Sequence, residues 1–571
     1  MSCATTSQDL APIPPILLLP DEILSDIFLL CCRTCLHLHA DADAWPLHAR
    51  PSWHTHNHSC TSRCWDWLTC SAMLVCRRWR DVLIGTKTLW ACPSFDHEHM
   101  SDIKRHEMFS VCGDAPLIIR HILTGTDTSM WLADFLGPQG GVSRCRELMI
   151  EICKSPKANM QDLFNVWPES APFLEVLSLS TDCFGHTRSP CLPLTLLRSA
   201  PRLRTLFLDN CALDHETWRA FPLHSLTTLA ICDICKDGLS PTTADVLALL
   251  QQTSQLQTLV LWCLDGDAEV NPLQYPDIIA SIPEISRISL CGSGLQPLEI
   301  MQRIIIPVYA VLELKFYYIR SEDNVPSRLA DVLRAHWKVS TLLQDPIAIV
   351  DAPDNFDAPP SLRSASVTCS EDRISIMGYV HPTISPQRDS TGPHDPLVHI
   401  ELNDTRFNPV PSIPSLLRAL RAYTITSLHL TELSLIGALE WQELWFIIPA
   451  VRVLHVTKLS PAVVSPFILT LTPHPTIAQQ CLLHALQELR LHEASFSGVG
   501  DTPPFAQLRA CLKARSDRGS PLRVLELKQC TVITEDDVRA LSGDGSVGRI
   551  ASDWDLDELL PVEDADDTES T

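Results

Sequence analysis

The residues most able to do chemistry are crowded between positions 31 and 64, where cysteine and histidine alternate with short polar stretches. Zinc takes four nitrogen or sulfur ligands in a tetrahedron, commonly from pairs of residues two to four positions apart. Cys60 and Cys64 form one such pair, and His54 and His58 form another. No spacing here matches a zinc finger. A zinc-dependent regulator or enzyme built on this segment is therefore an alternative, and a loop without metal is the favoured interpretation.

A second pattern with chemical meaning is G-x-G-x-x-G at Gly543, Gly545 and Gly548. A dinucleotide-binding loop follows a strand and opens a helix, because the helix N-terminus receives the pyrophosphate. Here the glycines follow a helix-like stretch (534–541) and lead into an acidic one. No serine, cysteine or histidine has a recognisable nucleophile context. We therefore expect no catalytic residue, no cofactor and no enzymatic activity.

Composition narrows the class of protein further. The 571 residues include 44 Lys and Arg against 68 Asp and Glu, a net charge of −24, which repels phosphate backbones and argues against nucleic acid. No apolar run is long enough to span a membrane, and no signal peptide is evident. The 23 cysteines then fit buried apolar positions better than disulfides. The sequence predicts a soluble intracellular protein, cytoplasmic or nuclear, with no membrane association.

Two amphipathic segments flank the Cys/His-rich stretch. In residues 17–33 (LLLPDEILSDIFLLCCR) apolar side chains recur at the spacing of one helix face, and Pro20 suits the first helical turn. Residues 68–83 repeat that spacing and predict a second helix, followed by a turn at Gly85 and an apolar hook at Leu89 and Trp90. Short helices with matched apolar stripes form a small bundle that completes its core against another element.

In order, LPDEILSDIFLLC and VCRRWRDVLIGTKTLW resemble the F-box, the adaptor-binding module of SCF-type cullin–RING ubiquitin ligases. The resemblance covers a small part of the chain, and residues 33–66 form a longer connection than the family has. It implies docking on a Skp-family adaptor and, through it, on a cullin–RING ligase. The adaptor-binding residues so implied are Leu19, Pro20, Ile23, Leu24, Ile27, Phe28, Val75, Trp79, Leu83 and Trp90.

The body of the chain repeats the pattern L-x-x-L-x-L. Successive copies begin at residues 174, 203, 226, 256, 285 and 309, at intervals of 29, 23, 30, 29 and 24 residues, and the pattern returns between 425 and 530. This period is typical of leucine-rich repeats, with one strand and one helical or irregular arm per repeat. An N-terminal F-box followed by a degenerate array resembles the F-box/leucine-rich-repeat-like proteins of mushroom-forming fungi.

The fold class predicted is α/β: a short helical F-box, then an irregular leucine-rich-repeat solenoid with a curved, mainly parallel sheet and helical arms. The expected parts are 1–16, a flexible N-terminus; 17–95, the F-box-like domain with an insert at 33–66; 110–350, the first part of the array; 351–420, an irregular segment with loops and short strands; 421–550, the second part; and 551–571, an acidic tail.

Side chains between the leucines of each strand face the other side of the sheet. Phe207 and Trp262 stand at such positions, and exposed rings there predict a patch that binds a protein target. The alternative is that loops cover this face. The function predicted is the substrate-recognition subunit of an SCF-type ligase, with an unknown protein target. One alternative is a leucine-rich scaffold without a ligase role, in which the F-box-like end only caps the solenoid.

Overall fold

The computed structural model forms two compact units, Met1–Leu239 and Ser240–Thr571, which are described separately. Their boundary falls inside the stretch 110–350, and the domain limits drawn from the sequence stay predictions. The described residues are 18–35, 72–91, 110–123, 141–152, 160, 164, 167, 170–181, 190–219, 221, 224–232, 241–264, 279–293, 295–307, 309–317, 319, 324–342, 361–370, 373–381, 396–403, 412–433, 436–473, 482–497 and 502–553. Among them, no helix has the length and apolarity needed to cross a membrane.

The described residues of the first unit begin with the helices α1 (Asp21–Cys35), α3 (Met73–Val75), α4 (Arg77–Gly85) and α5 (Lys87–Trp90). The helix predicted within 17–33 is confirmed by α1. A single helix over 68–83 is wrong, because the backbone at Cys76 is extended, with φ −160° and ψ 167°. The Cys76 sulfur accepts a hydrogen bond from the Trp79 backbone N–H at 3.4 Å and so caps the start of α4.

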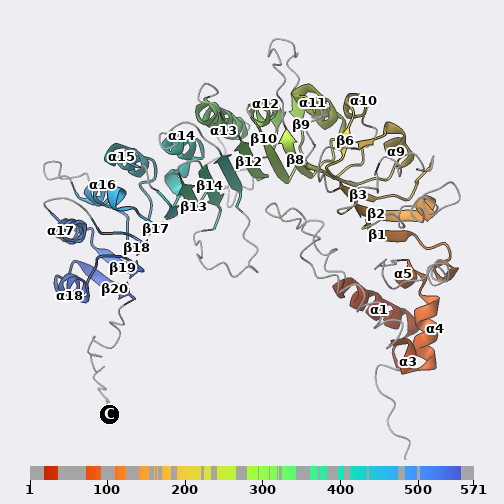
Figure 1. Ribbon diagram of the computed structural model, residues 1–571, viewed down its shortest axis with the longest axis horizontal. Coiled ribbons are helices and arrows are strands. Elements are labelled where there is room, and N and C mark those ends of the chain that lie inside the picture. The colour runs from red at the N-terminus through yellow and green to blue at the C-terminus, as the bar shows by residue number, and fades with distance from the viewer. Residues whose placement is uncertain are drawn as a thin grey trace, which may run out of the picture. The chain divides into compact units, whose positions relative to one another are not determined.

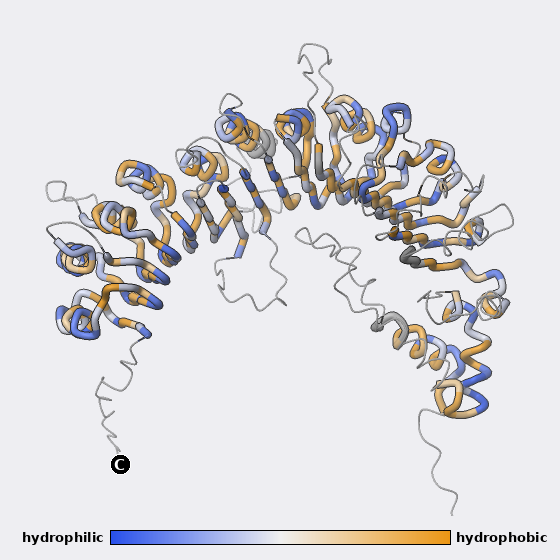
Figure 2. Tube along the Cα trace, viewed as in Figure 1, coloured by the Kyte–Doolittle hydropathy of each residue, from blue (hydrophilic) through white to orange (hydrophobic). Residues whose placement is uncertain are grey.

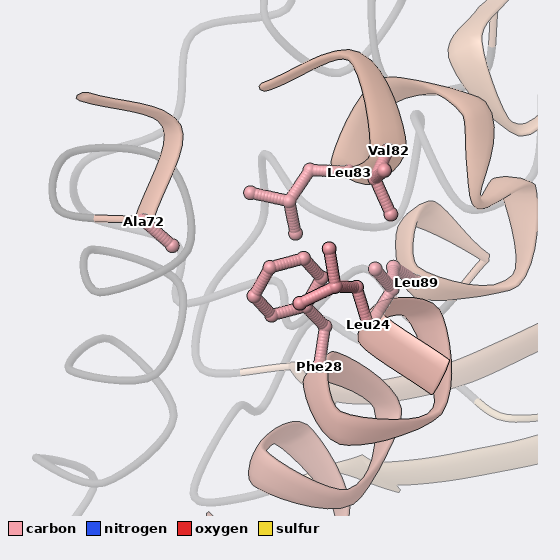
Figure 3. Close-up of a cluster of buried hydrophobic side chains, with 6 residues drawn as sticks. All are labelled: Leu24, Phe28, Ala72, Val82, Leu83 and Leu89. Carbon is pink, nitrogen blue, oxygen red and sulfur yellow. The ribbon is translucent and has the colours of Figure 1, made fainter. Parts of the chain in front are cut away.

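One hydrophobic core joins the two sequence blocks (Figure 3). Leu24 and Phe28, one turn apart on α1, point toward Leu83 from α4. The Phe28 and Trp79 rings meet edge to face, with centroids 5.1 Å apart. The fully buried members of the cluster are Leu24, Phe28, Ala72, Val82, Leu83 and Leu89. Segments far apart in the sequence therefore fold as one module.

The rest of the first unit is a parallel sheet in the order β1-β2-β3-β5-β7. The register places leucine beside leucine, as in Leu177, Leu206 and Leu229 of three successive strands. The strands are β1 (Leu117–Leu123), β2 (Cys145–Ile152), β3 (Val176–Thr181), β5 (Thr205–Asp209) and β7 (Thr228–Cys232), with η3 (Gly141–Arg144), α9 (Leu194–Ser199) and α10 (His215–Arg219) between them and a small pair, β4 (Cys191–Leu192) and β6 (Ala212–Leu213).

The second unit holds a sheet in the order β8-β10-β12-β15-β14-β13-β16-β17-β18-β19-β20, and helices α14 to α18 lie on one side of it (Figure 1). Its main strands are β8 (Thr258–Leu264), β10 (Arg287–Ser293), β12 (Val311–Tyr317), β13 (Ser364–Cys369), β14 (Arg373–Tyr379), β15 (Val398–Asn403), β16 (Ser427–Thr431), β17 (Val453–Thr457), β18 (Glu488–His492), β19 (Leu522–Lys528) and β20 (Val547–Ser552). A small pair is formed by β9 (Ala280–Ser281) and β11 (Ile304–Ile305).

The helices of this unit are α11 (Thr243–Gln252), α12 (Gln296–Gln302), α13 (Val325–Leu342), α14 (Ser412–Ala419), α15 (Ala438–Ile447), α16 (Pro461–Leu471), α17 (Pro504–Asp517) and α18 (Glu535–Gly543), with the short η6 (Ala422–Thr424). The glycine pattern that begins at Gly543 thus ends a helix and leads into β20, the reverse of the order in a dinucleotide loop. The predicted α/β fold with a mainly parallel sheet and helical arms is confirmed.

The segment predicted as irregular, 351–420, contributes three strands to this sheet in reversed order. β15 pairs in parallel with β12, β13 pairs in parallel with β16, and β14 lies between them antiparallel to both. The insertion therefore continues the sheet across the break in the leucine pattern. Hydrophobic (orange) and more polar (white to blue) residues follow one another along the strands of this unit (Figure 2).

A left-handed residue follows several strands and ties each to the next. The backbone φ is 60° at Glu432, 59° at Lys458 and 52° at Glu493. Each N–H donates to the carbonyl of the last residue of the neighbouring strand. The N–O distances are 3.1 Å from Glu432 to Thr457, 2.9 Å from Lys458 to His492 and 2.9 Å from Glu493 to Lys528. These bonds fix the ends of adjacent strands beside one another.

Candidate functional site

The ten residues predicted to bind an adaptor all lie in the helical module but differ in exposure. The buried ones are Leu24, Phe28 and Leu83; the half-buried ones are Leu19, Ile27, Trp79 and Trp90; the exposed ones are Pro20, Ile23 and Val75. The buried side chains hold the module together, and the exposed ones are free to meet another protein. Helical spacing identified the apolar stripe but did not separate these two roles.

The described part of the module exposes more large apolar side chains than the sequence indicated. Ile23 and Val75 are 45% and 57% exposed. The others are Leu18, Leu30, Leu74 and Ile84. Leu74 directly precedes Val75, where the break at Cys76 turns the short α3 away from α4. The sequence predicted one continuous helix over 68–83, and on that helix the exposure of Leu74 could not be predicted.

Polar contacts fix α1 against α4. The guanidinium of Arg78 donates to the Asp21 carboxylate, with its Nε and Nη2 atoms 2.9 Å and 2.6 Å from Oδ1, and also to the Leu19 carbonyl. The Ser25 and Thr86 hydroxyl oxygens lie 2.8 Å apart. These contacts hold the backbone of residues 19–25 in place, and with it the exposed Ile23.

The module also touches the sheet of its own unit. The Ile118 N–H donates to the Ala91 carbonyl at 2.7 Å, and the Cys112 thiol donates to the Trp90 carbonyl at 2.7 Å. Trp90 in turn donates its indole N–H to the Leu83 carbonyl at 2.7 Å. The end of α5 therefore satisfies a backbone donor of β1, the edge strand of this sheet.

The two rings predicted to bind a target, Phe207 and Trp262, are not both exposed. Phe207 is 3% exposed, so the expectation of an exposed ring there is wrong. Its neighbours in register, Ser178 and Ala230, are each 5% exposed, so the sheet around Phe207 is buried. Trp262 is half-buried: its indole N–H donates to the Ser289 hydroxyl at 2.8 Å, and the Lys315 Nζ lies 5.5 Å from its ring centroid. Its role in target binding stays a prediction.

Trp262 belongs to a buried polar network centred on Glu313, which is fully buried. Its carboxylate accepts from the Ser289 hydroxyl at 2.9 Å and from the Lys315 Nζ at 2.9 Å. Burial alone would raise the pKa of Glu313. The hydrogen bond from His399 and the charge and hydrogen bond of Lys315 outweigh it, so the pKa of this carboxyl is lowered.

The network continues onto the inserted strands through Glu401. Its carboxylate lies 2.8 Å from the Arg373 Nη2 on β14 and 3.1 Å from the Asn403 amide nitrogen. The Ser375 hydroxyl lies 3.3 Å from the His399 Nε2. Five strands, β8, β10, β12, β15 and β14, are thus joined by ionic and hydrogen-bonded side chains. The network locks the insertion to the repeats.

Three imidazoles line the same face farther along, on β16, β17 and β18. His429 and His455 stack with ring centroids 4.3 Å apart, and His455 meets His492 edge-on at 4.2 Å. Burial, together with the neighbouring His429, His492 and Arg490, lowers the pKa of His455 to about 3. Burial and His492 also lower the pKa of His429. His429 and His455 are therefore held in their neutral form at neutral pH.

A metal site is not among the features found. Within the described residues, no group of three or more His, Cys, Asp or Glu side chains is placed to hold a metal ion. Cys60, Cys64, His54 and His58 lie outside the described residues. The zinc hypothesis thus stays an alternative.

Comparisons with known proteins add little. No protein family matches the chain, and no curated protein matches it. Twenty-six chains of solved structures show some likeness, among them the "Crystal structure of TLR13-ssRNA13 complex", at 12% identity and a TM-score of 0.28. That match covers 75% of this chain and 55% of the other, so this chain spans about half its length. A TM-score this low supports no statement about fold or function.

Replacing Glu313 by alanine tests the buried network. We expect the free energy of unfolding to fall by about 3 kcal/mol, because Lys315 and Ser289 lose their partner in a buried site. The control is Glu432→Ala, which removes an exposed ion pair with Lys458 and should leave stability nearly unchanged. Equal urea midpoints for both variants would show that the network does not stabilise the fold.

The imidazole stack predicts a stability that declines in mild acid. In the unfolded chain His455 takes up a proton near pH 6.5, whereas in the folded chain it does so only near pH 3. The unfolded state therefore binds more protons between these two pH values, and the folded state loses stability as the pH falls through that window. We expect His455→Gln to reduce this slope by less than about 1 kcal/mol per pH unit. Urea titrations at pH 7.5 and 5.0 measure it. His484→Gln, at an exposed position, is the control and should not change the slope.

Proposed function

We propose that this chain is the substrate-recognition subunit of an SCF-type cullin–RING ubiquitin ligase. The helical module resembles an F-box and would dock on a Skp-family adaptor, and the repeated strands and arms would form a leucine-rich solenoid that presents a protein target. The observation that carries the proposal is that both F-box-like blocks share one core while Ile23 and Val75 remain exposed. Ubiquitin transfer would belong to other subunits.

The energetics of the module favour docking. Its core rests on few fully buried side chains, which is little for an independent fold. Burying the exposed half of an isoleucine or valine side chain against a partner contributes about 1 kcal/mol for each. Exposed Leu18, Leu30 and Leu74 extend the available apolar surface. Docking would therefore stabilise the module as well as recruit the adaptor.

A surface variant separates docking from folding. We expect Ile23→Asp combined with Val75→Asp to weaken co-purification with a co-expressed Skp-type adaptor more than about 100-fold, because two charges would enter an apolar interface. The thermal unfolding midpoint should change little, since both side chains are exposed.

Two further variants make the result interpretable. Leu439→Asp changes another exposed apolar residue, on α15, and should leave adaptor binding intact. Leu24→Asp places a charge in the core and should lose both binding and module folding. If the unmodified chain binds no adaptor, or if the surface variant binds it as well as the unmodified chain does, the proposal is wrong.

A second function is favoured by one observation: the bonds from Ile118 to Ala91 and from Cys112 to Trp90. These contacts would let the module act as a cap on the β1 edge of a scaffold without a ligase role. Terminal caps protect the edge of a repeat array and keep it soluble.

Deleting residues 1–95 distinguishes the two functions. If capping is the main role, we expect the first unit to lose its cooperative unfolding transition, because the β1 edge and its apolar face are uncovered. If docking is the main role, the transition should persist while adaptor binding disappears. Circular dichroism melting and adaptor co-purification on the same preparation read out both properties.

A further inference from the structure

Several ion pairs lie on the sheet face of the second unit that is opposite its helices. In these pairs the basic side chain lies closer to solvent and the carboxylate lies closer to the sheet. In each of these ion pairs the basic side chain is the more exposed partner. The exposed fractions are 51% for Arg373 over 11% for Glu401, 51% for Lys528 over 14% for Glu526, and 35% for Arg490 over 27% for Glu488. We name Arg373, Arg490 and Lys528, together with His492, the basic layer.

Register explains why these groups share one surface. Arg490 and His492 on β18 lie opposite Glu526 and Lys528 of β19, alternating with core leucines. The Glu526 carboxylate lies 2.5 Å from the Lys528 Nζ and 3.1 Å from the His492 Nε2. Burial alone would raise the pKa of this carboxyl, but the hydrogen bond and charge of Lys528 outweigh it, so the pKa is lowered. A ligand approaching from solvent therefore meets N–H donors first, although the whole chain carries a charge of −24.

The chain itself carries a segment of matching chemistry. Residues 554–571 contain eight Asp and Glu among 18 residues, and no Lys, Arg or His. This segment was singled out in the sequence as an acidic tail, and nothing in the adaptor role uses it. A charge-dense segment of this kind pairs with clustered guanidinium and ammonium groups.

The segment starts beside the basic layer. The carboxylate of Asp553, the last described residue, accepts a hydrogen bond from the Gln529 backbone N–H, and Gln529 directly follows Lys528. Neighbouring strands are ~4.8 Å apart, so the five steps from β19 to β14, which carries Arg373, span ~24 Å. Eighteen extended residues reach up to ~60 Å, enough to cross that distance. Tethering at this point gives a local concentration on the order of millimolar.

We infer that residues 554–571 bind across the basic layer, with their carboxylates on Lys528, Arg490 and Arg373. The segment masks this face of the sheet and competes with any acidic protein target that binds there. Binding of the segment does not depend on the adaptor role, because neither the module nor its exposed residues take part. The interaction is ionic and is weakened by salt.

The test uses two full-length chains. One is unmodified, and in the other all eight acids of residues 554–571 are replaced by their amides. The probe is a fluorescent synthetic peptide of residues 554–571, followed by anisotropy in 50 mM and 300 mM NaCl. We expect the amide chain to bind the probe at least tenfold more tightly than the unmodified chain, whose own segment occupies the face. High salt should weaken binding about tenfold or more.

Variants of the amide chain locate the site. Lys528→Ser with Arg490→Ser should reduce probe binding at least tenfold. Arg418→Ser is the matched control, since Arg418 is 55% exposed and pairs with Glu443 on the helical side of this unit, and it should change nothing. Melting curves confirm that each variant is folded.

Three results would overturn the inference. Equal affinity of both chains for the probe would mean that the segment does not occupy this face, and an acidic partner from another chain would be the better occupant. No binding to the amide chain in 50 mM NaCl would mean that the basic layer does not hold acidic peptides. An equal loss in the Arg418 variant would mean that attraction is non-specific.

Discussion

Register between neighbouring strands is the constraint on which the described structure depends. In each unit the leucines of one strand lie beside those of the next, as Leu454, Leu489 and Leu525 do on β17, β18 and β19. A slip of one residue would turn this apolar row to the opposite face. The left-handed residues after the strands prevent such a slip, because their N–H groups reach the neighbouring strand end only in this alignment. The core and the chemistry of the other face are therefore set together.

The same register forces polar residues of successive repeats into contact. Side chains at equivalent positions come within ~4.8 Å of each other, so charges on that face must be balanced by their neighbours. Glu313 pairs with Lys315 and His399, and His429 stacks on His455, both with lowered pKa values. Where the pairs sit near solvent, the flexible bases extend outward over shorter carboxylates. A nearly neutral face thus acquires a basic outer layer.

Much of the sheet could be predicted, because each repeat carries its own signal. The copy starting at residue 174 corresponds to β3, and that starting at 203 to β5, each strand beginning two residues after the first leucine. That leucine lies in the preceding turn and is buried. Strand β13 was missed because its sequence, SASVTC, has no leucine, and its place beside β16 follows from a reversed three-strand insertion. A template of tandem parallel repeats contains no such reversal.

The candidate surfaces were harder to predict than the fold, because exposure depends on partners far away in sequence. An apolar helical stripe spans more than one row of side chains. On α1, Leu24 packs in the core with Leu83 of α4 and Leu89 of α5, while the adjacent Ile23 is exposed. Phe207 similarly occupies a position that alternation assigns to the open face, yet it and its neighbours Ser178 and Ala230 are buried. Periodicity predicts which face of a helix or strand a side chain belongs to. It does not predict whether that face is exposed, because exposure depends on which other parts of the chain pack against it.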